Sequence, residues 1–250
     1  MYYDYFDYYN QTLQSEKRFY TIDFKQSDVT GDGILDNIFL VGTKPSGTES
    51  PFIGDITLIV QDGIAGGHTK VSLKENSGYN PTMFIGDFTG DRINDILISI
   101  DSGGSGGIGF YYVYSFVNNS PKKLFDFEKF NQEYKYEVNY KDNYIVEVIS
   151  KKLNTRYMID IRYKGKEYLS EIYDENGKLK EPIEGWVDPI SGLYPVDFQR
   201  DGIYELYTFQ RISGRYHADA LGYVQTSLEW DKSKFTPFFQ QISIYGEEMN

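Results

Sequence analysis

A chain of 250 residues is long enough to bury a sizeable core, as one large domain or two small ones. Its formal net charge of -12 argues against nucleic acid and anionic membranes as partners, because phosphate binding needs an excess of lysine and arginine. The chain contains no cysteine, which excludes disulfides and zinc–thiolate sites, and its 2 histidines argue against a multi-histidine zinc site.

Residues 1–19 form an acidic, tyrosine-rich segment that begins Met1-Tyr-Tyr-Asp-Tyr-Phe-Asp-Tyr-Tyr-Asn10. The segment lacks the positive n-region and the apolar h-region of a signal peptide. We expect a disordered or loosely packed terminus, with an adhesive segment or a closing strand as alternatives. Since no run approaches the roughly 18 apolar residues of a membrane span, we expect no membrane insertion.

The rest of the chain is rich in short runs of isoleucine, valine, tyrosine and phenylalanine bounded by turn residues, a pattern typical of β-strands. The predicted strands are Asp36–Val41, Asp55–Val60, Lys70–Leu73, Asp95–Ile100, Gly109–Val117, Tyr144–Ser150, Arg156–Tyr163, Tyr204–Gln210 and Tyr223–Trp230. Asp174-Glu-Asn-Gly177 predicts a hairpin turn, because Asn-Gly tolerates positive φ. No stretch shows a convincing amphipathic helix, and Ser120–Phe130 is expected to hold one helical turn at most.

An acidic loop recurs three times along the chain. The copies are Asp28-Val-Thr-Gly-Asp-Gly-Ile-Leu-Asp36, Asp87-Phe-Thr-Gly-Asp-Arg-Ile-Asn-Asp95 and the more degenerate Asp197-Phe-Gln-Arg-Asp-Gly-Ile-Tyr-Glu205. The first two lie about 55–60 residues apart, and the third follows after about two such periods. This recurrence predicts a single domain over residues 20–246 with four units, at 20–77, 80–131, 134–182 and 184–246. The third unit has a turn and a strand but no acidic loop.

Each unit is long enough for a four-stranded antiparallel sheet. One such sheet cannot bury both of its faces alone, so the units must pack on one another. Radial packing predicts an all-β propeller of four or five blades with calcium-binding loops, which also limits exposed edge strands. A pair of stacked β-sandwiches is the alternative.

The acidic loops have the ligand chemistry of calcium sites. Carboxylates at this density repel each other unless a cation lies between them, and hard oxygen ligands favour Ca²⁺ over soft metals. The predicted ligands are Asp28, Thr30, Asp32, the Ile34 carbonyl and Asp36 in the first loop, and Asp87, Thr89, Asp91, Ile93 and Asp95 in the second. The alternative is a metal-free turn whose aspartates cap backbone amides.

The recurrence resembles the FG-GAP/VCBS repeat family, in which Asp-x-Asn/Thr-Gly-Asp-Gly-x-x-Asp loops join the first two strands of propeller blades and bind Ca²⁺. The matching residues of the first loop are Asp28, Thr30, Gly31, Asp32, Gly33 and Asp36. The second loop departs at Arg92, and the third at Gln199, Arg200 and Glu205. The resemblance implies a structural Ca²⁺. It extends to VCBS-repeat proteins of spore-forming Gram-positive bacteria, which points to the cell envelope or spore surface.

The densest polar constellation outside these loops is Arg211-Ile-Ser-Gly-Arg-Tyr-His-Ala-Asp219. The candidate ligand-binding residues are Arg211, Arg215, Tyr216, His217 and Asp219, together with His68. They suit a carboxylate, a sugar or acid/base chemistry, whereas the structural alternative is an inter-strand loop with solvated charges. The glycine-rich stretch Asp101–Gly109 lacks the Lys-Ser/Thr of a P-loop and is expected to be a hairpin loop.

The sequence therefore predicts a non-enzymatic, calcium-binding β-propeller that binds a protein or a glycan at the cell or spore surface. We expect a monomer or weak oligomer with no nucleic-acid partner. The alternative is a polysaccharide hydrolase or lyase with a propeller-face site near His68 and His217. A third interpretation is a coat component that self-associates through the tyrosine-rich terminus.

Overall fold

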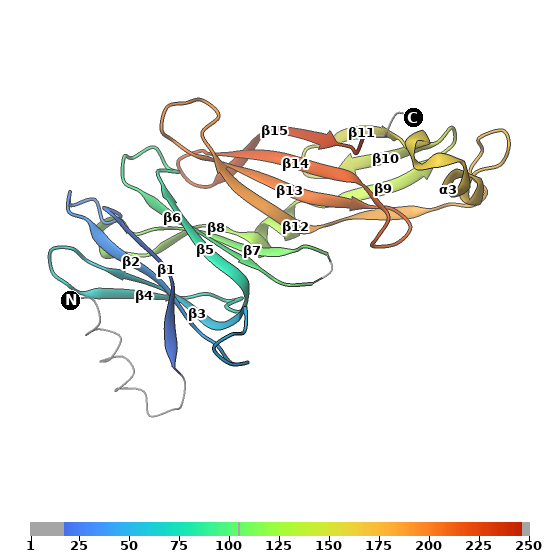
Figure 1. Ribbon diagram of the computed structural model, residues 1–250. Helices are drawn as coiled ribbons and strands as arrows, with labels where there is room; N and C mark the ends of the chain where they lie inside the picture. The colour runs from blue at the N-terminus through green and yellow to red at the C-terminus, as the bar shows by residue number, and fades with distance from the viewer. Residues whose placement is uncertain (1–17, 105, 247–250) are drawn as a thin grey trace. The chain divides into compact units, whose positions relative to one another are not determined.

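The computed structural model describes residues 18–104 and 106–246 (Figure 1). With 54% strand, 9% helix and antiparallel sheets, the protein belongs to the predicted all-β class. The prediction for the tyrosine-rich terminus falls outside the described residues, apart from Arg18 and Phe19. Among the helices that the structure describes, none is long and apolar enough to cross a membrane.

The first sheet has eight strands in the order β1-β2-β3-β5-β6-β7-β8, and β4 pairs with β3. Its strands are β1 (Phe19–Ser27), β2 (Asp36–Thr43), β3 (Phe52–Gln61), β4 (His68–Ser72), β5 (Gly78–Gly86), β6 (Asp95–Asp101), β7 (Gly109–Ser115) and β8 (Lys122–Asp126). A 3-10 turn, η1 (Val117–Asn119), separates β7 from β8.

The second sheet has seven strands in the order β11-β10-β9-β12-β13-β14-β15. Its strands are β9 (Tyr136–Lys141), β10 (Ile145–Ser150), β11 (Thr155–Asp160), β12 (Glu184–Val196), β13 (Glu205–Ser213), β14 (Ala220–Trp230) and β15 (Phe235–Ser243). The helical elements are α2 (Phe127–Glu133), the 3-10 turn η2 (Arg162–Lys164) and α3 (Gly165–Ile172). The sequence pattern does not predict α3, because eight residues are too few to establish a helical period.

The chain divides into two compact units, and each is described by itself. Of the described residues, unit 1 contains those up to Asp126 together with residues 195–205 and 230–235. Unit 2 contains residues 127–194, 206–229 and 236–246. Unit 1 therefore includes the turns between β12 and β13 and between β14 and β15, so all three acidic loops belong to it.

The prediction of four separate blades needs correction, because the strands form two continuous sheets. One end of β3 pairs with β5 through Phe52↔Tyr79, and its other end pairs with β4 through Gln61↔His68. The first two predicted blades therefore share one sheet. In the same way β12 pairs with β9 through Gly185↔Val138, which merges the last two. The loops recur as predicted, but hydrogen-bonded strand pairs cross the boundaries between the predicted units.

Alternating apolar residues build the core of each unit. Fully buried residues of unit 1 are Ile38 and Leu40 on β2, Leu58 and Val60 on β3, and Ile96 and Ile98 on β6. In unit 2 the core cluster includes Val146 and Val148 on β10, Ile172 on α3 and Val224 on β14. The helix α3 thus packs its apolar side against the second sheet.

The three acidic loops stack in order within unit 1. A Cβ atom added to Gly31 would lie 2.5 Å from Cδ1 of Ile93, and one added to Gly90 would lie 3.0 Å from Cδ1 of Ile203. The isoleucine of each later loop therefore packs on a glycine of the loop before it. Glycine is needed here for space as well as for its positive φ.

Backbone and aromatic contacts join the third loop to the second. The N–H of Tyr204 donates to the carbonyl of Asp87 at 2.8 Å. The ring of Tyr204 lies 4.9 Å from that of Phe84, and the ring of Phe235 lies 6.4 Å from that of Phe88. The turns contributed by the second half of the chain are therefore part of the packed interior of unit 1.

Replacing Gly31 by alanine tests the stack, with Gly33→Ala as the matched control. Both glycines have nearly the same φ, +85° and +86°, but no atom lies within 4 Å of a Cβ added at Gly33. Gly33→Ala should cost about 1 kcal/mol for the left-handed backbone. Gly31→Ala should cost about 2–4 kcal/mol, because its methyl group also overlaps Ile93. Urea denaturation measures both, and equal losses would contradict the stacking.

Candidate functional site

The first aspartate of each acidic loop closes the turn on itself. The two carboxylate oxygens of Asp28 accept the N–H groups of Gly31 at 2.7 Å and Gly33 at 2.8 Å. Asp87 accepts the equivalent N–H groups of Gly90 at 2.7 Å and Arg92 at 2.8 Å. Arg92 adopts a φ of 69°, so it reproduces the turn although it replaces the glycine of the first loop.

A buried carboxylate at the ninth position closes each loop from the inside. Asp36 is fully buried and accepts the N–H of Val29 at 2.9 Å. Asp95 accepts the N–H of Phe88 at 3.0 Å, and Glu205 accepts the N–H of Phe198 at 2.9 Å. Degeneration of the motif in the third loop therefore leaves this hydrogen bond intact.

The fit of the loops to calcium is mixed. Within the described residues, no group of three or more aspartate, glutamate, histidine or cysteine side chains is placed to hold a metal ion. However, the hydroxyls of Thr30 and Thr89, both predicted ligands, are buried and have no hydrogen-bond partner among the residues that the structure describes. A cation would give these oxygens a partner. Calcium binding by either loop therefore stays a prediction.

Burial has an electrostatic consequence in the second loop. It raises the pKa of Asp95 to about 7, opposed by the hydrogen bond from Phe88 and reinforced by the charges of Asp91 and Asp87. Burial also raises the pKa of Glu205 above its ordinary value, with a smaller contribution from Asp201 and Asp197. Without a cation, Asp95 and Glu205 therefore favour the protonated form more than free carboxylic acids do.

In unit 2, the polar constellation at 211–219 forms the turn between β13 and β14, and Asp219 anchors it. Its carboxylate accepts hydrogen bonds from Lys164 Nζ at 2.7 Å, the Tyr168 hydroxyl at 2.6 Å and the N–H of Arg215 at 3.0 Å. The hydroxyl of Tyr140 donates to it at 3.3 Å. Burial alone would raise the pKa of Asp219, but the donors from Lys164 and Tyr168 outweigh it and lower the pKa.

A second buried acid, Asp188 of β12, holds the other side of this turn. It accepts Arg211 Nε at 3.0 Å, the Ser213 hydroxyl at 2.8 Å and Trp186 Nε1 at 2.8 Å. His217 is exposed, with Nδ1 3.7 Å from Asp188 and its ring 5.0 Å from that of Trp186. Arg211 and His217, which the sequence predicted as candidates, thus lie around Asp188, which the sequence did not predict.

The remaining candidates are Arg215, Tyr216 and His68, and of these Arg215 meets Asp219 through its backbone N–H. Tyr216 is 54% exposed, and Arg215 pairs with Glu171 at 2.6 Å. His68 belongs to β4 in unit 1, where burial and the nearby Lys70 lower its pKa. The structure thus groups five of the six candidates in one turn of unit 2. Ligand binding by these residues stays a prediction.

The outer face of the second sheet carries a row of rings, which we call the aromatic face: Tyr194, Tyr207, Phe209, Tyr223 and Tyr245. Ring centroids are 5.5 Å apart for Tyr194 and Phe209, 6.2 Å for Phe209 and Tyr223, and 6.2 Å for Tyr223 and Tyr245. Tyr207 lies 4.8 Å from Phe209 on the same strand. These are the separations of interacting aromatic pairs, so the row is continuous across three strands and the segment after β15.

Strand register places the aromatic face away from the core. Phe209 pairs with Gln225, whereas the neighbouring Gln210 pairs with Val224, a core residue. Because successive side chains of a strand point to opposite faces, Phe209 and Gln225 face outward. In this strand Gln210 is 2% exposed, while the aromatic residue beside it stays half-buried. The usual partition of polar and aromatic residues is therefore inverted.

Amide groups and further rings border the row. Gln241 of β15 donates to the side chain of Gln225 at 2.9 Å, so both lie on the outer face. Strand alternation adds Phe239 to this face. Tyr194, Phe239 and Tyr245 are 55%, 52% and 45% exposed. The sequence did not predict this surface, because the alternation of residues in β13 does not itself say which of its two faces is buried.

Asp95→Asn should show whether the second loop holds a proton or calcium. In the folded protein Asp95 keeps its proton up to about pH 7. Wild-type stability from this group is therefore present at pH 4 and lost as pH rises through 7. Without calcium, the variant should match the wild type at pH 4 and melt at a higher temperature at pH 8. If millimolar Ca²⁺ instead stabilises the wild type alone at pH 8, the loop binds the metal.

Asp219→Asn should destabilise unit 2 by about 2–3 kcal/mol at pH 7, because Lys164 and two tyrosine hydroxyls lose a charged acceptor. The lowered pKa of Asp219 means that its contribution is present at neutral pH and lost as pH falls below its folded pKa. Denaturant unfolding at pH 7 and pH 3 should therefore show a smaller difference at pH 3. A difference independent of pH would contradict a charged anchor.

Comparison with known proteins corrects the FG-GAP/VCBS resemblance. The family model that matches residues 134–243 is the YybI C-terminal domain. "Uncharacterized protein YybI" from Bacillus subtilis (strain 168) is 48% identical over 225 residues, which cover 90% of this chain and 85% of that protein. No solved structure matches the chain. An acidic turn motif is short enough to recur outside the FG-GAP/VCBS repeats, whereas these matches span whole domains. The chain belongs to the YybI family.

Proposed function

We propose that the protein is a non-enzymatic binding module that holds a neutral glycan on the aromatic face of unit 2. The observation that carries this proposal is the inverted partition on β13, where Thr208 and Gln210 are buried and Tyr207 and Phe209 lie on the outer face. Exposed large aromatic side chains gathered in one patch mark a binding surface more often than chance.

The chemistry of the patch suits a polysaccharide. Aromatic rings stack on the C–H faces of sugar rings, and amide groups both donate to and accept from sugar hydroxyls. Gln241 supplies an exposed amide on the same face as the rings, where it is held by a hydrogen bond to the buried Gln225. The charged pair Arg211 and Asp188 is internally neutralised at 3.0 Å. A neutral ligand is thus favoured over an anionic one, which the net charge of -12 would also repel.

The polar groups beside the aromatic face favour binding over hydrolysis. A general acid or base needs a titratable group free to exchange a proton with the substrate. Asp188 accepts three hydrogen bonds from side chains, and Asp219 is held by Lys164 and Tyr168. Both buried acids are therefore engaged in holding the turn. A glycan-binding module of this kind would act at the cell or spore surface, where polysaccharides are displayed.

Neighbouring phenylalanines on β15 give a matched test. Phe239 lies on the outer face and is 52% exposed, whereas Phe238 points to the other side of the strand and is 44% exposed. Phe239→Ala and Tyr194→Ala should each weaken binding to a polysaccharide by about tenfold, which corresponds to one lost stacking contact. Phe238→Ala should leave binding unchanged.

Co-sedimentation of the full chain with purified peptidoglycan, chitin and cellulose provides the measurement. Circular dichroism confirms that each variant is folded. Equal losses for Phe238→Ala and Phe239→Ala would sink the proposal, as would the absence of saturable binding to all three polymers. Release of reducing sugar by the wild type would favour the hydrolase alternative.

A further inference from the structure

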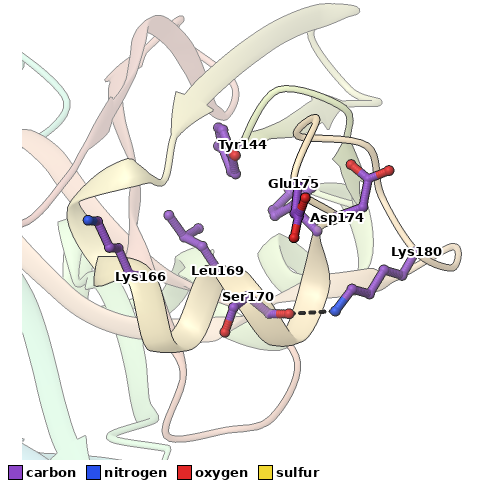
Figure 2. Close-up of a pocket in the computed structure, with 8 residues that line it drawn as sticks. Tyr144, Lys166, Leu169, Ser170, Asp174, Glu175 and Lys180 are labelled. Carbon is purple, nitrogen blue, oxygen red and sulfur yellow. Dashed lines mark hydrogen bonds between the residues drawn. The ribbon is translucent and has the colours of Figure 1, made fainter.

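A cavity in unit 2 shares no residue with the aromatic face. It has a volume of about 570 Å³ and lies between α3 and the turn at residues 174–177 (Figure 2). Tyr144, Leu169 and Tyr173 give it an apolar lining, and Lys166, Asp174 and Glu175 bring charges to it. A concave, mostly apolar site with a few polar groups at its edge is the usual form of a small-molecule site.

The lining of the cavity is preformed. The rings of Tyr144 and Tyr173 meet edge to face at 4.9 Å. The N–H of Asn143 donates to the carbonyl of Gly177 at 2.7 Å, which fixes the turn against Tyr144. Gly177 has a φ of +72°, and a Cβ atom there would lie 3.3 Å from the Tyr144 ring. Binding would therefore require little reorganisation of the protein.

Opposite charges stand on opposite sides of the cavity. Figure 2 shows Lys166 on one side, Asp174 and Glu175 on the other, and Leu169 between them. Lys180 Nζ donates to the carbonyl of Ser170 at 2.6 Å, so that its charge is used within the protein. Lys166 and Glu175 are exposed and make no hydrogen bond or ion pair with any residue that the structure describes. Both charges are therefore available to a ligand.

Tyr173 provides an independent indication of an occupant. Its side chain lines the cavity and is 2% exposed, yet its hydroxyl has no hydrogen-bond partner among the described residues. A buried hydroxyl without a partner is unfavourable, because it has lost its hydrogen bonds to water. A ligand that carries amide groups would supply the missing acceptor.

We propose that this cavity binds a short zwitterionic peptide of two or three residues with apolar side chains. The carboxylate of the peptide faces Lys166, its ammonium group faces Glu175 and Asp174, and its side chains rest on Tyr144 and Leu169. A free amino acid carries both charges on one α-carbon, so its two charged groups cannot face opposite sides of the cavity. Each further residue of a peptide adds about 3.5 Å between the ammonium and carboxylate groups. The proposal is independent of glycan binding.

Isothermal titration of the full chain with Leu-Leu, Leu-Leu-Leu, free leucine and N-acetyl-Leu-Leu-amide tests the proposal. The two zwitterionic peptides should bind saturably, and free leucine and the capped dipeptide should bind at least about tenfold more weakly. Equal binding of the capped and free dipeptides would overturn the assignment of the charges. No saturable binding of either peptide would overturn the site itself.

Matched variants locate the binding. Lys166→Gln and Glu175→Gln should each weaken Leu-Leu binding by about three- to fivefold, as expected for loss of one exposed ion pair. Lys178→Gln and Glu181→Gln change the same charges nearby at residues that do not line the cavity, and they should have no effect. Equal effects in the two sets would show that net charge alone is responsible and would overturn the proposal.

Discussion

One buried carboxylate closes each acidic loop, and the construction of unit 1 depends on it. Asp36, Asp95 and Glu205 are the first residues of β2, β6 and β13, and each accepts the N–H of the second residue of its loop. The hydrogen bond fixes where the loop ends and the strand begins. The requirement is for a buried acceptor rather than for one side-chain length, since glutamate fulfils it in the third loop.

Two further acids do similar work in unit 2. Asp188 and Asp219 hold the β13–β14 turn from both sides and gather donors from β12, η2 and α3. The hydrogen bonds that these donors make offset the desolvation of the two carboxylates. With the charged groups occupied in this way, what remains for ligands is the aromatic face and the cavity beside α3. In unit 2, the residues that stabilise the fold are thus different from those that we propose to bind ligands.

The sequence predicted the local features well and the assembly poorly. Every predicted strand overlaps an observed strand, because β-branched and aromatic runs between turn residues are a local signal. The prediction of separate blades was wrong because β3 is 10 residues long and pairs with different strands at its two ends. No local sequence pattern predicts that pairing.

The candidate residues show the same limit. Their close spacing in the sequence pointed to Arg211, His217 and Asp219 as candidates. It did not point to Asp188, because this residue lies far from them in the sequence and outside any cluster of polar residues. The aromatic face was missed for a related reason. In β13 polar Thr208 and Gln210 occupy the core side, so a reading based on hydrophobic alternation assigns the strand the wrong way round.

The second half of the chain contributes two turns to unit 1, and these turns limit where the chain can be cut into fragments that fold. The family model covers residues 134–243 and so includes Tyr204 and Phe235, whose ring partners Phe84 and Phe88 lie outside it. A fragment cut at the boundaries of that model would carry two orphaned aromatic surfaces into solvent and would tend to aggregate. Conversely, a fragment ending at Asp126 would lack the third member of the loop stack. The boundary of the matching family model is therefore not a boundary at which the folded chain can be cut.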